Sequence, residues 1–342
     1  MRALVYKDGS IALKEREYPK LRSPKDAIVK VTYSSICTSD LHIKNGFVPR
    51  AKNDIVLGHE FVGEVVEVGS EVKLKIGDRV SANCITFCGE CYFCKKGFIN
   101  NCEKGGWELG CRIDGCQAEY VRVPFADTGL TKIPDNVSYN QALFVGDILA
   151  SGYFGVELCD VCKDETVAVI GAGPVGLCSM TCARLFTDSK IIAIDIDESR
   201  LEFAREKEFA DVTLNPLNVN VEEFVKSETS GRGADNVIEA AGTKESFEAS
   251  WKIARPNAVV AVVAMYEESL RLPLPEMYGK NLVFKTGGVD AVHSEKLLDL
   301  ISQGKISTDF LISKEFSLDE IENAYRNFEH KTEGCLKFTI RH

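Results

Sequence analysis

Four cysteines stand close together in the first third of the chain, at Cys88, Cys91, Cys94 and Cys102. Their spacing is C-x2-C-x2-C-x7-C, and four thiolates can complete a tetrahedral zinc shell that leaves no position for a substrate. An iron–sulfur cluster and reduced free thiols are the alternatives, but in clusters the fourth cysteine usually follows sooner and precedes proline. The spacing therefore favours a structural zinc in a lobe of about residues 84–106.

A second group of possible metal ligands is scattered along the chain. Cys37 lies in Ser-Ile-Cys-Thr-Ser-Asp-Leu-His after a β-rich segment, and His59 lies in Leu-Gly-His-Glu-Phe-Val-Gly before a strand-like run. One thiolate, one imidazole and one carboxylate would make a catalytic zinc site with an exchangeable fourth position. Taken alone, a single cysteine and a single histidine are more often core residues than ligands.

A glycine-rich turn, Gly171-Ala-Gly-Pro-Val-Gly176, follows an apolar strand predicted at 166–170 and precedes a helix predicted at 177–186. This context is typical of dinucleotide-binding turns. Gly171 and Gly173 let the backbone approach a pyrophosphate, and the free N–H groups at the start of the helix attract the phosphates. Gly176 lets the helix pack closely against the strand.

The next predicted strand, 190–194, ends at Asp195. A carboxylate there can accept hydrogen bonds from both hydroxyls of the adenosine ribose, but it would repel a 2′-phosphate. Asp195 therefore predicts NAD rather than NADP.

These segments need an α/β scaffold with two domains, and 342 residues are too many for one compact core. Apolar runs at 236–242, 258–264 and 282–288 complete a predicted six-stranded doubly wound sheet. An amphipathic run at 294–303 and a terminal strand at 335–340 should return to the first domain. The expected parts are a β-rich catalytic domain at 1–149, a cofactor domain at 150–288 and a return segment at 289–342.

Composition restricts the location and the partners. The net charge of −10 argues against nucleic acid or an anionic membrane as a partner. The N-terminus lacks a signal-peptide pattern, and we expect that no apolar stretch approaches the roughly 20 residues that cross a bilayer. We expect a cytoplasmic protein, in which thirteen cysteines indicate metal ligands or buried thiols rather than disulfides.

The motifs G-H-E-x-x-G-x-V, C-T-S-D-x-H, the four-cysteine lobe and G-x-G-x-x-G occur here in one order and spacing. This combination resembles the zinc-dependent alcohol dehydrogenases of the medium-chain dehydrogenase/reductase superfamily, nearly from end to end. The resemblance is greatest to the bacterial secondary-alcohol branch. It implies a GroES-like catalytic domain and a Rossmann domain.

The resemblance also implies roles for residues of the scattered group. Cys37, His59 and Asp147 match the ligands of the catalytic zinc, and Glu60 matches a glutamate that lies beside the metal and can enter its coordination shell. Asp147 could instead be a helix N-cap, since it precedes Ile-Leu-Ala-Ser. Asp40 matches a carboxylate that hydrogen-bonds the zinc-bound histidine. The resemblance assigns a proton relay to Ser39 and His42.

For the cofactor, the resemblance implies contacts from both domains. Arg200 matches a basic residue that reaches the same ribose as Asp195. The secondary-alcohol enzymes often use NADP and have a small or basic residue at the position of Asp195, so the chain departs from them there. The residues expected to contact NAD are Thr38, Ser151, Gly171, Gly173, Pro174, Val175, Gly176, Asp195, Arg200, Val263 and Met265.

The expected reaction is reversible, zinc- and NAD-dependent oxidation of an alcohol to a ketone or aldehyde. Trp107 matches a tryptophan of the substrate pocket in the secondary-alcohol branch, and together with Asp147 this match favours a secondary alcohol as substrate. Trp107 could instead be an ordinary packing aromatic. The lobe is missing from many members of that branch, so a polyol or diol dehydrogenase, acting on sorbitol, butanediol or threonine, is the alternative. Two alternatives come from a different class of protein, a zinc-free quinone reductase and a non-catalytic binding protein. Either would lack the zinc ligands, whereas this chain retains Cys37, His59, Glu60 and Asp147. The resemblance further implies a homo-oligomer, with a tetramer favoured.

The remaining cysteines carry weaker signals. Cys159 and Cys162 have C-x-x-C spacing outside a thioredoxin-like pattern, so we interpret that spacing as incidental. Three others are expected in the core, namely Cys178, Cys182 and Cys335. The roles of Cys84, Cys111 and Cys116 stay undecided.

Overall fold

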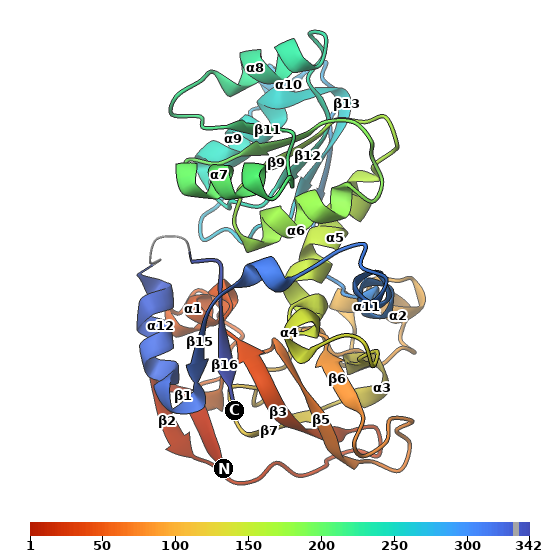
Figure 1. Ribbon diagram of the computed structural model, residues 1–342, viewed down its shortest axis with the longest axis vertical. Helices are drawn as coiled ribbons and strands as arrows, with labels where there is room; N and C mark the ends of the chain where they lie inside the picture. Colours follow the sequence, from red (N-terminus) through yellow and green to blue (C-terminus); the bar gives the residue numbers. More distant parts are fainter. Residues whose placement is uncertain (331–334) are drawn as a thin grey trace. The chain divides into compact units, whose positions relative to one another are not determined.

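The computed structural model describes residues 1–330 and 335–342. The chain divides into two compact units (Figure 1). The first comprises Met1–Ala150 together with Asp290–His342, and the second comprises Ser151–Val289. The last fifty or so residues thus belong to the same unit as the N-terminal half, and the second unit is an insertion within the first.

The first unit is built mainly from β-strands. A seven-stranded sheet has the order β15-β16-β3-β5-β6-β8, with β7 beside β3, and a smaller sheet has the order β2-β1-β4. The long central strand β3 is largely buried, and it contains β-branched and aromatic residues that favour strands, namely Ile28, Val29, Val31, Thr32 and Tyr33. The strands are β1 (Arg2–Lys7), β2 (Ser10–Glu15), β3 (Ala27–Ser35), β4 (Ile55–Val56), β5 (Phe61–Val68), β6 (Arg79–Ala82), β7 (Tyr120–Val123), β8 (Leu130–Lys132), β15 (Ile312–Ser317) and β16 (Lys337–Arg341).

Short helices connect and cover these strands. The predicted terminal strand is β16, and the predicted amphipathic run is α11. The helix α12 packs against β2, β15 and β16, and it buries Tyr325. The helical elements of this unit are α1 (Thr38–Lys44), α2 (Tyr92–Lys95), η1 (Ile99–Asn101), α3 (Ala126–Gly129), α4 (Tyr139–Ala142), η2 (Val145–Leu149), α11 (Ser294–Ser302), η3 (Asp309–Leu311), η4 (Leu318–Glu320) and α12 (Ile321–Glu329).

The second unit contains the predicted six-stranded parallel sheet, in the order β11-β10-β9-β12-β13-β14. Every residue of β9 and β10 is buried, as expected for parallel strands covered on both faces. The α/β fold class is therefore confirmed. The strands are β9 (Val167–Ile170), β10 (Ile191–Ile194), β11 (Val212–Leu214), β12 (Ala234–Glu239), β13 (Ala254–Val262) and β14 (Val283–Thr286).

Helices α6, α7 and α9 pack against this sheet. The sequence placed the helix after the glycine-rich turn at 177–186, but α6 begins at Pro174 and ends at Ala183. Proline favours the first helical position because its fixed φ suits the helix and its missing N–H is not needed there. The helices are α5 (Ala150–Cys159), α6 (Pro174–Ala183), α7 (Glu198–Glu206), α8 (Val221–Glu228), α9 (Lys244–Ile253) and α10 (Leu274–Met277).

One sequence expectation about apolar length was wrong. The helical run Tyr139–Cys159 has 21 residues and a mean hydropathy of 1.4, so by length and composition it could cross a membrane. Asp147 and Glu157 interrupt its apolar sequence, so no uninterrupted apolar stretch of that length is present within it. It is 78% buried inside the protein, as the core helix of a globular protein would be.

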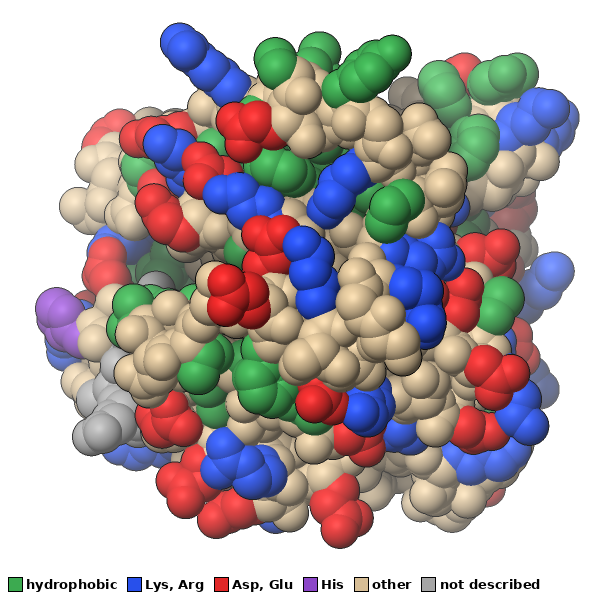
Figure 2. Space-filling model, turned by 90° about the horizontal axis from the view of Figure 1, so that it is seen from above, with side chains coloured by type: hydrophobic (Ala, Val, Ile, Leu, Met, Phe, Trp, Pro, Cys, Tyr) green, Lys and Arg blue, Asp and Glu red, His purple; other side chains and the backbone are tan. Residues whose placement is uncertain are grey.

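The surface carries mixed charges. On the face drawn in Figure 2, acidic and basic side chains alternate with apolar ones rather than gathering by sign.

Candidate active site and metal centres

Strands β3 and β5 bring Cys37 and His59 together. The two strands pair antiparallel, with Ser34 opposite Phe61. Cys37 follows the end of β3 and is the N-cap residue of α1, while His59 precedes β5 by two residues. Because the end of one strand meets the start of its antiparallel neighbour, two residues 22 positions apart in sequence lie at the same edge of the sheet.

Asp147 reaches the same edge from a π-helical turn, Val145–Leu149. Such turns are rare and occur frequently at functional sites. A Cβ atom on Gly146 would lie 1.8 Å from the Ala82 carbonyl oxygen, so only glycine lets the turn pack this closely against β6. The turn sits within the helical run Tyr139–Cys159, and the N-cap interpretation of Asp147 therefore does not describe its position.

The three side chains converge on one point. Their ligand atoms all lie within 4.8 Å of one another, and all three residues are buried. Asp147 Oδ2 is 3.3 Å from His59 Nε2 and 3.6 Å from Cys37 Sγ. A thiolate, an imidazole and a carboxylate form the donor set of a catalytic zinc, with one coordination position left open. The residues therefore fit a zinc ion.

Asp40 lies behind the imidazole. Its Oδ1 atom is 3.3 Å from His59 Nδ1, and its Oδ2 atom accepts hydrogen bonds from the Cys37 backbone N–H at 3.0 Å and from Gln117 Nε2 at 3.3 Å. Tyr325 in turn donates its hydroxyl to Gln117 Oε1 at 2.8 Å. Asp40 thus contacts both the Cys37 backbone and the His59 ring. The buried side chains of Gln117 and Tyr325 position Asp40 in turn.

Glu60 is bound to a lysine that the sequence analysis did not single out. Lys337, on β16, is 2% exposed at its side chain and donates to the Glu60 carboxylate and, at 2.8 Å, to the Ile36 carbonyl. The second oxygen of Glu60 is buried without a hydrogen-bond partner. A lysine in a strand-like run near the C-terminus gives no signal of its own, because an alternating strand pattern places half of its side chains on a solvated face.

The charges in this interior perturb one another. Burial raises the pKa of Cys37, and Lys337 opposes this increase while Asp147 and Glu60 add to it. Burial also raises the pKa of Glu60 to about 7 against the opposing effect of Lys337. Burial alone would lower the pKa of His59, but the Asp40 and Asp147 carboxylates raise it well above its ordinary value. A divalent cation among these groups would favour the thiolate, the neutral imidazole and the carboxylate together.

The remaining residues predicted around this site lie on α1 and beside His59. Ser39 Oγ is 3.2 Å from His59 Nε2, the nitrogen that faces Cys37 and Asp147. His42 is one helical turn further along α1, and it is partly exposed. The rings of Trp107 and His59 pack edge to face, with 5.6 Å between their centroids, and the guanidinium carbon of Arg50 lies 5.3 Å from the centroid of the Trp107 ring.

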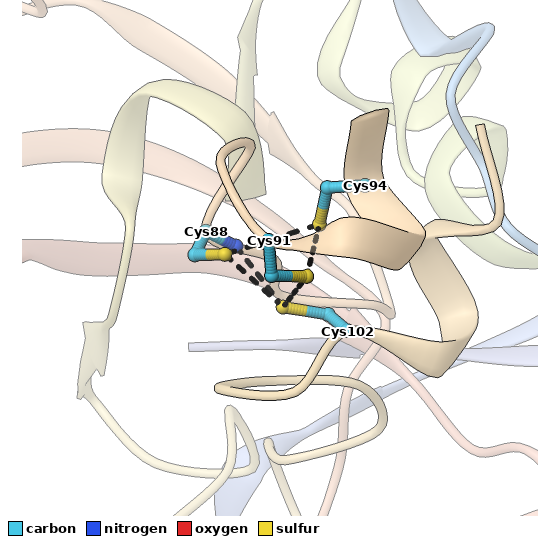
Figure 3. Close-up of side chains that lie close together, drawn as sticks. All are labelled: Cys88, Cys91, Cys94 and Cys102. Carbon is cyan, nitrogen blue, oxygen red and sulfur yellow. Dashed lines mark hydrogen bonds between the residues drawn. The ribbon is translucent and has the colours of Figure 1, made fainter. Parts of the chain in front are cut away.

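The four-cysteine lobe forms a separate cluster (Figure 3). The sulfur–sulfur distances are 3.4 Å for Cys91–Cys94, 3.6 Å for Cys88–Cys102, 3.9 Å for Cys88–Cys94 and 4.0 Å for Cys91–Cys102. Metal–sulfur bonds of about 2.3 Å in a tetrahedron place sulfurs about 3.8 Å apart. The four thiols therefore fit one zinc ion and would enclose it completely.

Backbone amides support this cluster. The N–H groups of Cys88 and Lys104 point to Cys102 Sγ at 3.3 and 3.4 Å. The backbone amides of Cys94 and Glu103 lower the pKa of Cys91 to about 6. Amide donors stabilise thiolates, which are the form that binds metal.

Comparison with known proteins agrees with both metal centres. Residues 23–135 match the model of the alcohol dehydrogenase GroES-like domain, and residues 174–302 match that of the zinc-binding dehydrogenases. An alcohol dehydrogenase from Cupriavidus necator is 35% identical over 365 residues, covering 100% of this chain and 98% of that protein. The chain belongs to the zinc-binding alcohol dehydrogenase family.

Solved structures support the same assignment. Alcohol dehydrogenase TADH from Thermus sp. ATN1 has a TM-score of 0.92 and 35% identity, covering 100% of this chain and 99% of that one. An alcohol dehydrogenase from E. coli CFT073, solved with NADH, has a TM-score of 0.91 and 28% identity, covering 100% and 99%. The chain is thus a zinc-dependent alcohol dehydrogenase with a catalytic Cys-His-Asp site and a structural four-cysteine site.

In this alcohol dehydrogenase the glycine-rich turn joins β9 to α6. A Cβ atom on Gly176 would lie 1.7 Å from the Gly171 carbonyl oxygen, so glycine is required for the tight turn. Helix α6 begins at Pro174, which has no N–H group, and the backbone N–H groups of Val175 and Gly176 in its first turn have no carbonyl partner within the helix. These groups are free to bind phosphate oxygens.

Asp195 follows β10 and lies beside this turn. Its carboxylate accepts hydrogen bonds from the Ala172 and Asp197 backbone amides at 2.6 and 2.9 Å. Arg200, on α7, has a guanidinium nitrogen 3.7 Å from the position of a Cβ on Gly173, and its Nε atom is 3.7 Å from Asp197. The structure thus brings Asp195 and Arg200 close to Gly173, three residues that were predicted to bind the cofactor. Each carboxylate oxygen of Asp195 has a further lone pair that can accept a hydrogen bond from a ligand.

The other predicted cofactor residues lie elsewhere. Val263 and Met265 follow β13 at the carboxyl edge of the same sheet, and Met265 is 51% exposed. Ser151 lies on α5 of the same unit, and Thr38 is an exposed residue of α1 in the first unit.

Two of the undecided cysteines lie at the catalytic site. Cys84 donates its backbone N–H to the Gly146 carbonyl at 3.1 Å, next to Asp147. Cys116 Sγ donates to the Glu60 carbonyl at 3.4 Å. Cys111 instead packs in an apolar cluster of the first unit. Cys178 and Cys182 are buried as predicted, whereas Cys335 is only partly buried.

Proposed function

We propose that the enzyme catalyses reversible, NAD-dependent oxidation of a secondary alcohol to a ketone at the Cys37, His59 and Asp147 site. The observation that carries this proposal is the convergence of these three buried ligands, next to a serine hydroxyl 3.2 Å from His59 Nε2. When bound, zinc supplies a Lewis acid that lowers the pKa of the substrate hydroxyl, and NAD accepts the hydride.

The side chains around the metal site orient its ligands and transfer the proton of the substrate hydroxyl. Asp40 holds the Nδ1 proton of His59, so that Nε2 remains available as a ligand. The Ser39 hydroxyl takes the proton of the substrate hydroxyl, and His42, one turn further along α1 and partly exposed, passes it to solvent. Lys337 holds Glu60 beside the site, as the glutamate that can enter the coordination shell.

The preference for NAD rests on Asp195. The family does not decide the cofactor, because the E. coli CFT073 relative was solved with NADH and a zinc-binding dehydrogenase from Sinorhizobium meliloti, 28% identical with a TM-score of 0.90, was solved with NADP. The Asp195 carboxylate lies beside the glycine-rich turn, where it would face the adenosine ribose and repel a 2′-phosphate. Arg200 reaches the same ribose. Thr38, Ser151, Val263 and Met265 contact the rest of the cofactor.

The substrate class follows from Trp107 and Asp147. Trp107 packs against His59, so its ring forms one wall for a small substituent on the carbinol carbon. Initial rates with NAD and NADP against 2-propanol, 2,3-butanediol, sorbitol and threonine test this assignment. We expect the highest kcat/KM with NAD and 2-propanol; a preference for NADP would overturn the Asp195 argument, and exclusive use of sorbitol would overturn the substrate.

A polyol or diol dehydrogenase is the second candidate. The four-cysteine lobe favours it, because many simple secondary-alcohol enzymes lack such a lobe. A relative named D-xylulose reductase A, from Aspergillus clavatus, is 33% identical and covers 92% of this chain and 90% of that protein. The same rate panel separates the two candidates, since a polyol enzyme would give its highest kcat/KM with sorbitol or 2,3-butanediol.

The setting of the enzyme is also a proposal. All thirteen cysteines lie in the described residues and none of them forms a disulfide there, which suits a reducing cytoplasm. We expect the four-cysteine zinc to hold the surface lobe in shape. We further expect a homo-oligomer, with a tetramer favoured, whose mass light scattering would measure.

A further inference from the structure

A fully buried glutamate, Glu239, ends strand β12 at the carboxyl edge of the parallel sheet. In open parallel sheets this edge is where ligands bind. The glycine-rich turn after β9 and the Val263–Met265 segment after β13 lie at the same edge, because β12 pairs with both strands (Figure 1). The catalytic chemistry described above does not use Glu239.

The carboxylate of Glu239 is held by three neutral donors. Its Oε1 atom accepts the backbone N–H groups of Ala241 and Gly242 at 2.8 and 2.9 Å, and its Oε2 atom accepts the Tyr266 hydroxyl at 2.6 Å. Burial and the neighbouring carboxylate raise the pKa of Tyr266 far above its ordinary value, so the phenol keeps its proton and remains a donor. A buried carboxylate with this many donors is a strong local constraint.

The backbone of Glu239 adds a second set of links. Its carbonyl oxygen accepts the N–H groups of Val263 and Ala264 at 2.9 and 3.3 Å. Through its side chain and its backbone, one residue therefore ties the loop 240–242 and the segment 263–266 to the end of β12.

The loop 240–242 in turn contacts the glycine-rich turn. A Cβ atom on Gly171 would lie 3.0 Å from the backbone of Ala240 and Ala241, and one on Gly242 would lie 2.8 Å from the Met265 carbonyl oxygen. The loop 240–242 is thus packed backbone against backbone with Gly171 on one side and with Met265 on the other, and it separates the glycine-rich turn from the 263–266 segment.

We propose that Glu239 and Tyr266 form a positioning pair, which fixes the Val263–Met265 segment relative to the glycine-rich turn and thereby sets the affinity for the nicotinamide half of the cofactor. This inference rests on the proposed function in one respect, namely that Val263 and Met265 contact the nicotinamide. The pair acts through the segments that it holds and not through a contact of its own with the cofactor. The adenosine half, held at Asp195 and the turn, is bound independently of the Tyr266 hydroxyl.

Tyr266→Phe is the central variant, because it removes only the hydroxyl and keeps the ring contact with Phe247. The matched control is Thr229→Val. Thr229 is also buried and donates its hydroxyl to the Val225 carbonyl at 2.6 Å, but it lies before β12, at the opposite edge of the sheet. Both variants remove a hydroxyl from the same unit, and Thr229→Val also removes the acceptor of the Gly233 N–H at 2.9 Å, so a general loss of stability affects the control at least as much.

The experiment measures dissociation constants for NADH by fluorescence and for ADP-ribose by calorimetry, with unfolding midpoints for each protein. We expect Tyr266→Phe to weaken NADH binding about tenfold and to leave ADP-ribose binding within about twofold, whereas Thr229→Val changes neither. Glu239→Gln should weaken NADH binding less than tenfold, because an amide oxygen can still accept the two backbone N–H groups.

Unchanged NADH binding in Tyr266→Phe would overturn the positioning pair. Equal losses for NADH and ADP-ribose would also overturn it, because they would show a general loosening of the domain. If the wild-type enzyme bound ADP-ribose but neither NADH nor NADPH, the proposed function itself would fail, and the pair with it.

Discussion

The two metal centres differ in how the chain assembles them. The four-cysteine centre comes from a single segment of fifteen residues, 88–102, and its ligands lie on short local turns. The catalytic centre takes Cys37 from the end of β3, His59 from the start of β5 and Asp147 from a π-helical turn. The first centre is therefore a local structure, and the second exists only when three distant elements pack together.

The surroundings of the two centres differ as well. Backbone amides are the main partners of the four thiols, whereas charged side chains surround the catalytic ligands: Asp40, Glu60 and Lys337. Four thiolates leave zinc closed to a substrate, while three ligands leave one position open. The difference shows that the more conspicuous metal motif is the structural one, and the predictions below test that contrast.

The largest expected effect is on catalysis at the scattered centre. His59→Ala should lower kcat at least about a thousandfold, because the metal that lowers the substrate pKa loses its imidazole ligand. Zinc content, measured by atomic absorption, should fall from two ions per chain to one. His330→Ala, at an exposed position, is the control and should keep both ions. Retained activity with one zinc per chain would contradict this assignment.

The next effect is on stability at the local centre. Cys102→Ala should release the other zinc and lower the thermal midpoint, because zinc binding at structural sites is worth about 10–16 kcal/mol in small peptides. The chains that remain folded should keep most of their kcat. Cys162→Ala removes an exposed thiol outside both centres and should change neither quantity. The contrast between the centres fails if Cys102→Ala abolishes turnover without changing the midpoint.

Lys337→Met tests the charged surroundings of the catalytic centre. Removing Lys337, the ion-pair partner of buried Glu60, should cost about 3–5 kcal/mol of unfolding free energy, because the Glu60 carboxyl group then stays in the interior without its cation. The double variant Lys337→Met with Glu60→Gln should recover part of the loss. Urea unfolding of the single and double variants measures the coupling. Additive losses would show that the pair does not interact.

The smallest effect is a difference in the rate of metal loss from the unaltered enzyme. A chelator should remove the catalytic zinc about tenfold faster than the structural one, since three ligands and an open position give the chelator access. Activity should therefore disappear with the first equivalent of zinc released, while the thermal midpoint changes only with the second. Simultaneous release of both ions would remove this distinction.

Patterns that are local in sequence were predicted well. The four-cysteine spacing, the six-stranded parallel sheet and the glycine-rich turn all appear as expected, because each depends on residues a few positions apart or on a strand-length run. The boundaries of helices were predicted less exactly: α6 starts three residues earlier than predicted, and the long apolar helical run Tyr139–Cys159 was not predicted. The short strand β11 was not located, since three residues form too short a pattern.

Partners that meet across the fold could not be predicted from the residues alone. Lys337 and Glu60 are 277 positions apart, and nothing near either residue indicates the other. The Tyr325–Gln117–Asp40 chain and the Glu239–Tyr266 bond are of the same kind. Family resemblance carried the assignment of Asp147, whose local sequence also suits a helix cap.

By itself, the sequence determined which side chains can bind a metal or a phosphate and which segments form strands or helices. Ligand chemistry and hydrophobic period are properties of residue type and short spacing. Only the tertiary structure decided that Cys37, His59 and Asp147 share one site with Lys337 and Glu60 behind it. Contacts between distant segments depend on how sheets and helices pack, and that packing is a property of the whole chain.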